Sequence, residues 1–217
     1  MDMGRLAIFD LDGTLLDTIG DLAEACNYML SLRGLAPHTR EEYHKMVGNG
    51  ILKLVERALP EELRSPEYVM AAREDFLAYY IDHIDRYTRP YDGIREVLHT
   101  LQDEGWTLAV ASNKFDSGTK HLVATIFPEV KFKAIYGNRE DFPLKPDAAL
   151  VELIMKECEA ECKMTTMIGD SGVDMQTAKN GGVRSIGCTW GFRSHEELEQ
   201  NGADIIVDNP IEILKVL

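Results

Sequence analysis

An α/β fold, with a doubly wound parallel sheet and an inserted all-helical domain, is predicted from two features of the sequence. After Pro90, short apolar runs alternate with amphipathic helical patterns, which is typical of parallel strands covered by helices on both faces. From Thr18 to about Ile84 the pattern is helical throughout. We therefore expect a Rossmann-like core built from residues 1–16 and 84–217, with residues 17–83 inserted after its first strand.

Six short apolar runs are the expected core strands. The first, RLAIFD, ends in an acid, as a buried parallel strand does at the edge of a sheet. The helix that follows Pro90 is expected to begin at the N-cap Asp92 and to end at Gly105. The expected strands are residues 5–10, 107–112, 133–137, 165–170, 184–188 and 204–207.

Two helix starts are visible in the helical segment. Thr39, followed by Glu42 three residues later, predicts a capping box, in which each residue binds the other's backbone amide. Ser65 before Pro66 marks the start of a later helix, since proline is well suited to the first helical position. The segment therefore contains several helices rather than one long one.

Composition and charge narrow the classes of protein to be considered. The chain has 217 residues with 23 Lys and Arg against 37 Asp and Glu, a net charge of −14. Such a surface repels nucleic acid and anionic lipid. No apolar run approaches the roughly 18 residues of a membrane span, and the N-terminus lacks the features of an export signal. We expect a cytoplasmic protein that binds neither nucleic acid nor membranes, with its four scattered cysteines reduced.

Polar residues cluster at the expected ends of the core strands. Because the carboxyl ends of parallel strands meet at one edge of a sheet, these side chains are expected to converge there. Any one of the acids alone would be interpreted as a helix cap or a turn residue, but together they would repel one another without a cation. Oxygen ligands with no nearby His or Cys favour Mg²⁺, so the pattern predicts a magnesium-dependent phosphoryl-transfer site. The residues are Asp10, Asp12, Ser112, Asn113, Lys145, Asp170 and Asp174.

Four ordered motifs resemble those of the haloacid dehalogenase superfamily of phosphatases. They are FDLDGT (Phe9–Thr14), ASN (Ala111–Asn113), LKPD (Leu144–Asp147) and GDSGVD (Gly169–Asp174). The helical segment 17–83 is similar to the helical cap domain that this superfamily inserts after its first motif. Within the superfamily, segments such as DLDGTLLDTIGDL and TWGFRSHEELEQNGADIIVD resemble phosphoglycolate phosphatases most closely.

This resemblance implies a role for each motif residue. Asp10 would be the nucleophile that forms an aspartyl-phosphate, and Asp12 the general acid and base. Asp170 would hold Mg²⁺ together with Asp10 and the carbonyl of Asp12, and Asp174 would join them directly or through water. Ser112, Lys145 and the backbone of Asn113 would bind phosphate, and Gly13 and Thr14 would form the turn beside it.

The helical segment is expected to select the leaving group. Gly48, Asn49 and Gly50 precede a helix whose amides could bind a small carboxylate such as that of 2-phosphoglycolate; an ordinary glycine-rich turn is an equally good interpretation. A small phosphorylated metabolite is thus the expected partner, with 2-phosphoglycolate ahead of sugar phosphates, pyrophosphate and nucleoside monophosphates. The chain is expected to be a monomer or a homodimer.

Three other functions are open to a sequence of this kind. A sugar phosphomutase of the same superfamily would place a histidine and a basic residue where this chain has Leu22 and Ile51. A haloalkanoate dehalogenase needs neither Asp12 nor Mg²⁺. A non-catalytic phospho-acceptor also uses acidic strand ends, a hydroxyl and a lysine, but lacks the second aspartate and a long helical insertion.

Overall fold

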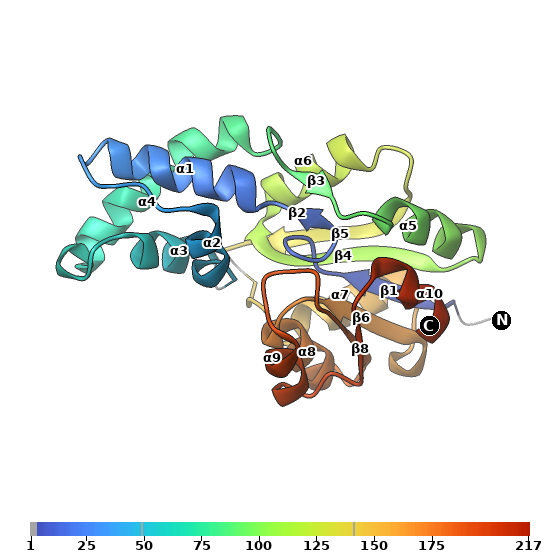
Figure 1. The fold of residues 1–217 in the computed structure, drawn as a ribbon. Helices are drawn as coiled ribbons and strands as arrows, with labels where there is room; N and C mark the ends of the chain where they lie inside the picture. Colours follow the sequence, from blue (N-terminus) through green and yellow to red (C-terminus); the bar gives the residue numbers. More distant parts are fainter. Residues whose placement is uncertain (1–3, 49, 141) are drawn as a thin grey trace. The chain divides into compact units, whose positions relative to one another are not determined.

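The computed structural model describes residues 4–48, 50–140 and 142–217, which form two compact units (Figure 1). One unit combines the chain up to Leu16 with Pro90–Leu217, and the other is Asp17–Arg89. The chain passes between the units at β2 (Leu16–Asp17) and β3 (Arg89–Pro90), which pair as a two-stranded sheet.

The first unit is built on a six-stranded parallel sheet with the order β5-β4-β1-β6-β7-β8. β1 is central, with Phe9 opposite Val110 of β4 on one side and Ile168 of β6 on the other. Strand order therefore reverses at β1, which confirms the doubly wound α/β fold, and in folds of this kind ligands bind beyond the carboxyl end of the strands at this point. The strands are β1 (Leu6–Phe9), β4 (Thr107–Phe115), β5 (Phe132–Asn138), β6 (Thr165–Gly169), β7 (Arg184–Cys188) and β8 (Ile205–Val207).

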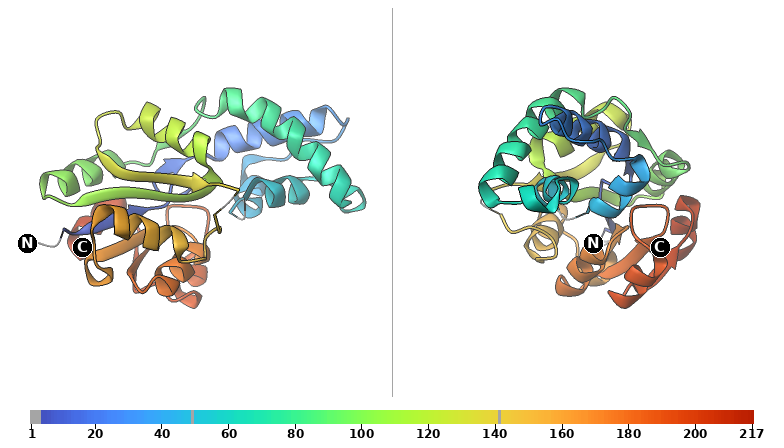
Figure 2. Two further views of the ribbon diagram at one scale, coloured as in Figure 1. Left: turned by 180° about the vertical axis from the view of Figure 1, so that it is seen from behind. Right: turned by 60° about the vertical axis from the view of Figure 1, so that its left-hand side comes forward.

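Helices lie on both faces of this sheet (Figure 2). Successive side chains of a strand point to opposite faces, so Leu6 and Ile8 of β1 share one face, where they join a buried cluster with Val151 and Ile154. The longer helices of this unit are α5 (Ile94–Asp103), α6 (Asp116–Ile126), α7 (Ala149–Cys158) and α8 (Gly172–Asn180), and the shorter ones are η3 (Cys162–Met164), α9 (His195–Gln200), η4 (Pro210–Glu212) and α10 (Ile213–Val216).

Helix α5 begins one residue later than expected. Gly93, not Asp92, is its N-cap, and the backbone of Gly93 is left-handed with φ of 89°. A glycine adopts this conformation without the steric cost that a side chain would add. The expected N-cap Asp92 was therefore wrong by one position, because sequence rules for caps favour the aspartate over the glycine beside it.

The second unit is helical, as predicted. Thr39 and Glu42 form the expected capping box: Thr39 Oγ1 accepts a hydrogen bond from Glu42 N at 3.3 Å, and Glu42 Oε2 accepts one from Thr39 N at 2.7 Å. Ser65 caps the last long helix, with Oγ 3.3 Å from Tyr68 N. The helices are α1 (Ile19–Ser31), α2 (Arg40–Met46), α3 (Gly50–Ala58), η1 (Glu61–Leu63), α4 (Pro66–Tyr80) and η2 (Ile81–His83).

The helical unit extends to Arg89, beyond the expected boundary at residue 83. Asp21 of α1 is buried, and its carboxylate accepts hydrogen bonds from Tyr87 N at 2.9 Å, Thr88 N at 2.8 Å and Thr88 Oγ1 at 2.6 Å. These bonds attach the segment after η2 to α1. The helical pattern ends near residue 84, so periodicity alone could not extend the unit past that point.

Two other expectations concern helices and thiols. None of the helices that the structure describes combines the length and the apolar character needed to cross a bilayer. The four cysteines are free, as expected: Cys26 and Cys188 are buried, Cys158 is half-buried and Cys162 is exposed.

Candidate active site

The turn after β1 brings two distant segments into contact. Asp10 directly follows the strand, and its N–H donates to Ile168 O of β6 at 2.9 Å. Gly13 follows with φ of 87°, and a Cβ at this position would lie 2.4 Å from Asp170 Oδ2. Only a glycine fits here, because the backbone is left-handed and the neighbouring carboxylate leaves no room for a side chain.

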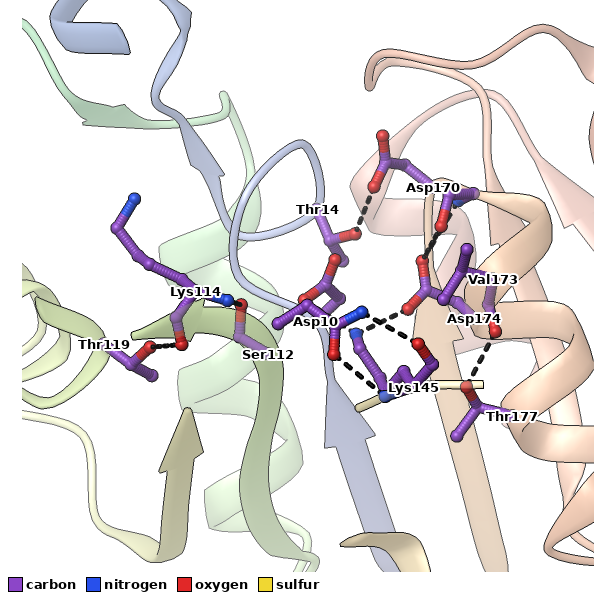
Figure 3. A network of polar contacts seen from close by, with 12 residues as sticks. Asp10, Thr14, Ser112, Lys114, Thr119, Lys145, Asp170, Val173, Asp174 and Thr177 are labelled. Atoms are coloured by element: carbon purple, nitrogen blue, oxygen red, sulfur yellow. Dashed lines mark hydrogen bonds and ion pairs between the residues drawn. The ribbon is translucent and has the colours of Figure 1, made fainter. Parts of the chain in front are cut away.

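Lys145 lies between two of the predicted acids (Figure 3). Its Nζ is 2.9 Å from Asp10 Oδ1 and 2.7 Å from Asp174 Oδ1, and the lysine is 5% exposed. The side chain of Asn113 holds the backbone beside it: Nδ2 donates to Lys145 O at 3.0 Å, and Oδ1 accepts from Lys145 N at 2.9 Å. This bracing role of the Asn113 side chain was not predicted, since no local pattern reports a contact between these two segments.

The two downstream acids are held by different partners. Asp170 accepts hydrogen bonds from Thr14 Oγ1 at 3.3 Å and from Phe192 N at 2.7 Å. Asp174 is fully buried at the start of α8, where its Oδ2 accepts from Ser171 N at 3.1 Å and from Ser171 Oγ at 2.6 Å. Ser171 is a further residue that sequence analysis did not single out, although its position before α8 is typical of an N-cap.

Three of the carboxylates form one buried cluster. Oxygen atoms of Asp10, Asp170 and Asp174 all lie within 4.8 Å of one another. Burial, opposed by Lys145 and reinforced by the neighbouring acids, raises the pKa of Asp10 to about 7, and burial raises the pKa of Asp170 well above its ordinary value. The single positive charge of Lys145 does not balance the negative charge that three ionised carboxylates would carry. A set of oxygen donors of this kind fits a hard divalent cation such as Mg²⁺.

Asp12 and Ser112 are joined through a lysine that the sequence analysis did not single out. Ser112 is buried, and its Oγ accepts a hydrogen bond from Lys114 N at 3.2 Å. The Nζ of Lys114 lies 3.0 Å from Asp12 Oδ1. No pattern within either segment predicts this ion pair, because Lys114 and Asp12 are far apart in the chain.

The loop after β7 also reaches the site. Trp190 Nε1 donates to Thr14 O at 3.0 Å, and the neighbouring Phe192 N–H is the donor to Asp170. A Cβ on Gly191 would lie 2.3 Å from Asp170 Cβ, so the loop approaches the aspartate as closely as its backbone allows. The hydrogen bond from Trp190 to the turn after β1 was not predicted.

The glycines proposed for anion binding belong to the helical unit. Gly48 has φ of 117°, and Gly50 is the first residue of α3 with φ of 81°. Asn49 lies outside the described residues. Of the three residues predicted to bind an anion, the structure therefore describes the two glycines, both of which belong to the helical unit.

Comparison with known proteins identifies relatives along nearly the whole chain. A phosphoglycolate phosphatase of Agrobacterium fabrum is 34% identical over 214 residues, which cover 95% of this chain and 89% of the relative. A phosphoglycolate phosphatase of Aquifex aeolicus is 29% identical, with 98% of this chain and 96% of the relative covered.

Solved structures share the fold. A crystal structure from Lactobacillus delbrueckii subsp. bulgaricus superimposes with a TM-score of 0.92 at 31% identity, covering 99% of this chain and 98% of that one. The structure of a predicted phosphoglycolate phosphatase from Haemophilus somnus gives a TM-score of 0.89 at 26% identity, covering 100% and 99%. Residues 7–188 match the family model of haloacid dehalogenase-like hydrolases, which confirms the resemblance seen in the four motifs. The chain therefore belongs to the family of haloacid dehalogenase-like hydrolases.

Proposed function

We propose that the protein is a Mg²⁺-dependent phosphatase that hydrolyses a small phosphorylated metabolite, with 2-phosphoglycolate as the first candidate. The observation that carries the proposal is the buried cluster of Asp10, Asp170 and Asp174 around Lys145 at the carboxyl edge of the sheet. The names of the relatives from Agrobacterium fabrum and Aquifex aeolicus support the choice of substrate.

In the first step, a carboxylate oxygen of Asp10 attacks the phosphorus atom of the substrate. A new bond forms between Asp10 and phosphorus while the bond from phosphorus to the leaving-group oxygen breaks, and Asp12 donates a proton to that oxygen. Lys145 neutralises part of the charge that three carboxylates and a phosphate bring together, which the separation of 2.9 Å between its Nζ and Asp10 Oδ1 supports.

In the second step, water replaces the enzyme on phosphorus. Asp12, now a carboxylate, takes a proton from the attacking water, and the bond between phosphorus and Asp10 breaks to release orthophosphate. Both aspartates return to their starting forms, so each cycle consumes one phosphate ester and one water molecule. Ser112 and the backbone of Asn113 bind the phosphate oxygens during both steps.

Asp10, Asp170 and the backbone carbonyl of Asp12 would hold Mg²⁺. When bound, Mg²⁺ offsets the negative charge of the acids and of the phosphate oxygens. Asp174 contributes through water or by orienting Lys145, because its two carboxylate oxygens already accept hydrogen bonds from Ser171 and Lys145. Of the direct and water-mediated roles that the sequence analysis left open for Asp174, we propose the indirect one.

The helical unit acts as a cap that selects the leaving group. Gly48 lies before α3 and Gly50 is its first residue, and as glycines neither has a Cβ that would crowd an anion at the backbone amides. A small anionic leaving group such as glycolate suits this end of the helix. The α/β unit is accordingly the catalytic core of the protein.

A panel of kcat/KM values over small phosphate esters, measured with Mg²⁺, tests the proposal. We expect turnover of 2-phosphoglycolate above that of sugar phosphates, and loss of all turnover in Asp10→Asn. Asp103→Asn, which changes an exposed aspartate at the end of α5, serves as the matched control and should retain the parental rate. A stable phosphoprotein without turnover would identify a phospho-acceptor instead, and transfer of phosphate between positions of a sugar would identify a mutase.

A further inference from the structure

Lys114, near the end of β4, is a buried lysine that pairs with Asp12 in the turn after β1. Its side chain is 3% exposed, and Nζ lies 3.0 Å from Asp12 Oδ1, whose side chain is 20% exposed. Lysine is almost never this buried unless its charge is paired. The turn after β1 and the end of β4 are therefore linked by a charge pair beside the acid cluster.

The backbone of Lys114 is held on several sides. Its N–H donates to Ser112 Oγ at 3.2 Å, and its carbonyl accepts a hydrogen bond from Thr119 Oγ1 at 3.3 Å. A Cβ on Gly137 of β5 would lie 2.5 Å from Lys114 O, so this approach requires glycine. These contacts fix the position of the Lys114 backbone, from which its side chain extends.

A shift in strand register directs this part of β4. The ladder between β4 and β5 pairs Ala111 with Tyr136 and next pairs Phe115 with Asn138, so β4 has more residues than β5 between the two pairs. Such irregularities bend a strand and redirect its side chains, and they are frequent beside active sites. The irregular stretch includes both Ser112 and Lys114.

We infer that Lys114 is a positioning residue that holds the carboxylate of Asp12 for proton transfer to the leaving group. The inference rests on the proposed function, in which Asp12 is the general acid and base. Lys114 contacts Oδ1 of Asp12 at 3.0 Å, and the proton can be carried and transferred at the other oxygen, Oδ2. The contact is therefore compatible with catalysis by Asp12. An ammonium group is a compact charge with three donors, which suits a contact to one oxygen better than the planar fork of an arginine.

If Lys114 positions Asp12, its loss should affect substrates differently according to the basicity of their leaving groups. A strongly basic leaving oxygen needs a proton as its bond to phosphorus breaks, whereas a weakly basic one departs with little help. Misplacing Asp12 therefore slows the first kind of substrate more than the second. A lysine that only stabilises the fold would affect both kinds equally.

The test compares phenyl phosphate with p-nitrophenyl phosphate, which are similar in shape but differ in the basicity of the leaving oxygen. We expect Lys114→Met to lower kcat/KM for phenyl phosphate on the order of tenfold more than for p-nitrophenyl phosphate. Lys120→Met is the matched control, because Lys120 also pairs with an aspartate, Asp116 at 2.7 Å, but its side chain is 52% exposed. The control should lower neither value.

A double-mutant cycle shows whether Lys114 acts through Asp12. In the Asp12→Asn background, Lys114→Met should cause no further selective loss against phenyl phosphate. If Lys114→Met unfolds the protein, Lys114→Gln removes the charge and shortens the side chain but stays polar, and it should show the same selective loss. Equal losses for both substrates in the folded lysine variants would overturn the inference alone. An Asp12→Asn variant without selectivity would instead contradict the proton transfer in the proposed function.

Discussion

The buried carboxylate of Asp10 should lower the stability of the metal-free protein, so Asp10→Asn should raise its free energy of unfolding. Burial raises the pKa of Asp10 from 3.8 to about 7. Each pKa unit corresponds to about 1.4 kcal/mol, so the ionised carboxylate costs the folded state on the order of 4 kcal/mol above pH 7. Asparagine has nearly the same shape and no charge, and Lys145 keeps Asp174 as a partner at 2.7 Å.

The gain should depend on pH in a defined direction. Below pH 3.8 the carboxyl is protonated in both states, and Asp10→Asn should change stability little. Between pH 3.8 and about 7, Asp10 ionises in the unfolded chain but keeps its proton in the folded protein. The free energy of unfolding of the parent therefore falls as pH rises through this interval. The advantage of the asparagine variant should grow over this interval and level off above it.

Urea unfolding in EDTA at pH 5 and pH 8 measures the effect. Both tryptophans, Trp106 and Trp190, belong to the α/β unit, so their fluorescence follows the unit that contains the cluster. Mg²⁺ at 100 times its dissociation constant should stabilise the parent by about 2.7 kcal/mol. This would reduce the difference in free energy of unfolding between Asp10→Asn and the parent. Asp103→Asn is the control. An asparagine variant no more stable than the parent at pH 8, or a gain that does not shrink at pH 5, would refute the reasoning.

Three further predictions concern the metal, the loop after β7 and the end of the helical unit. Chelation with EDTA should abolish phosphatase activity and added Mg²⁺ should restore it, as measured by phosphate release. Gly191→Ala should weaken Mg²⁺ binding measured by calorimetry, because the new Cβ would lie 2.3 Å from Asp170 Cβ and would displace that ligand. Asp21→Asn should lower the free energy of unfolding by about 1–3 kcal/mol, because an amide nitrogen cannot accept the hydrogen bonds from Tyr87 and Thr88.

Controls keep these outcomes specific. Full activity in EDTA would remove the metal from the mechanism. Unchanged Mg²⁺ affinity in Gly191→Ala would show that the loop yields without moving the aspartate. Asp82→Asn alters an exposed aspartate of η2 and should leave stability unchanged, so a loss equal to that of Asp21→Asn would contradict the role of the buried carboxylate.

The positions of the core strands along the chain and the helical nature of the insertion are predictable because both depend on local patterns. Apolar runs identify β1 and β6 to within a residue or two of their ends. β4 is different: the apolar run stops at residue 112, yet the strand continues through polar residues to Phe115. Hydrophobicity cannot predict a polar strand end at a site, because such a segment is held by hydrogen bonds and charge pairs rather than by apolar burial.

The candidate site was predictable where its residues belong to compact motifs and unpredictable where they act through distant contacts. Asp10, Asp170 and Asp174 follow strand ends, where the topology of a parallel sheet brings them together. The contacts of Asn113 with Lys145 and of Trp190 with Thr14 join segments far apart in the chain. No periodicity or spacing within either segment reports the other.

The split of the α/β unit into two stretches of sequence has a consequence for synthesis on the ribosome. β1 emerges first, but its neighbour β4 is made about 100 residues later, which corresponds to roughly 5–20 s of translation. During that delay the whole of the intervening helical unit can fold, while the apolar LAIF segment of β1 cannot yet pair with β4. Nascent chains arrested between Arg89 and β4 should therefore be especially prone to aggregate or to recruit chaperones.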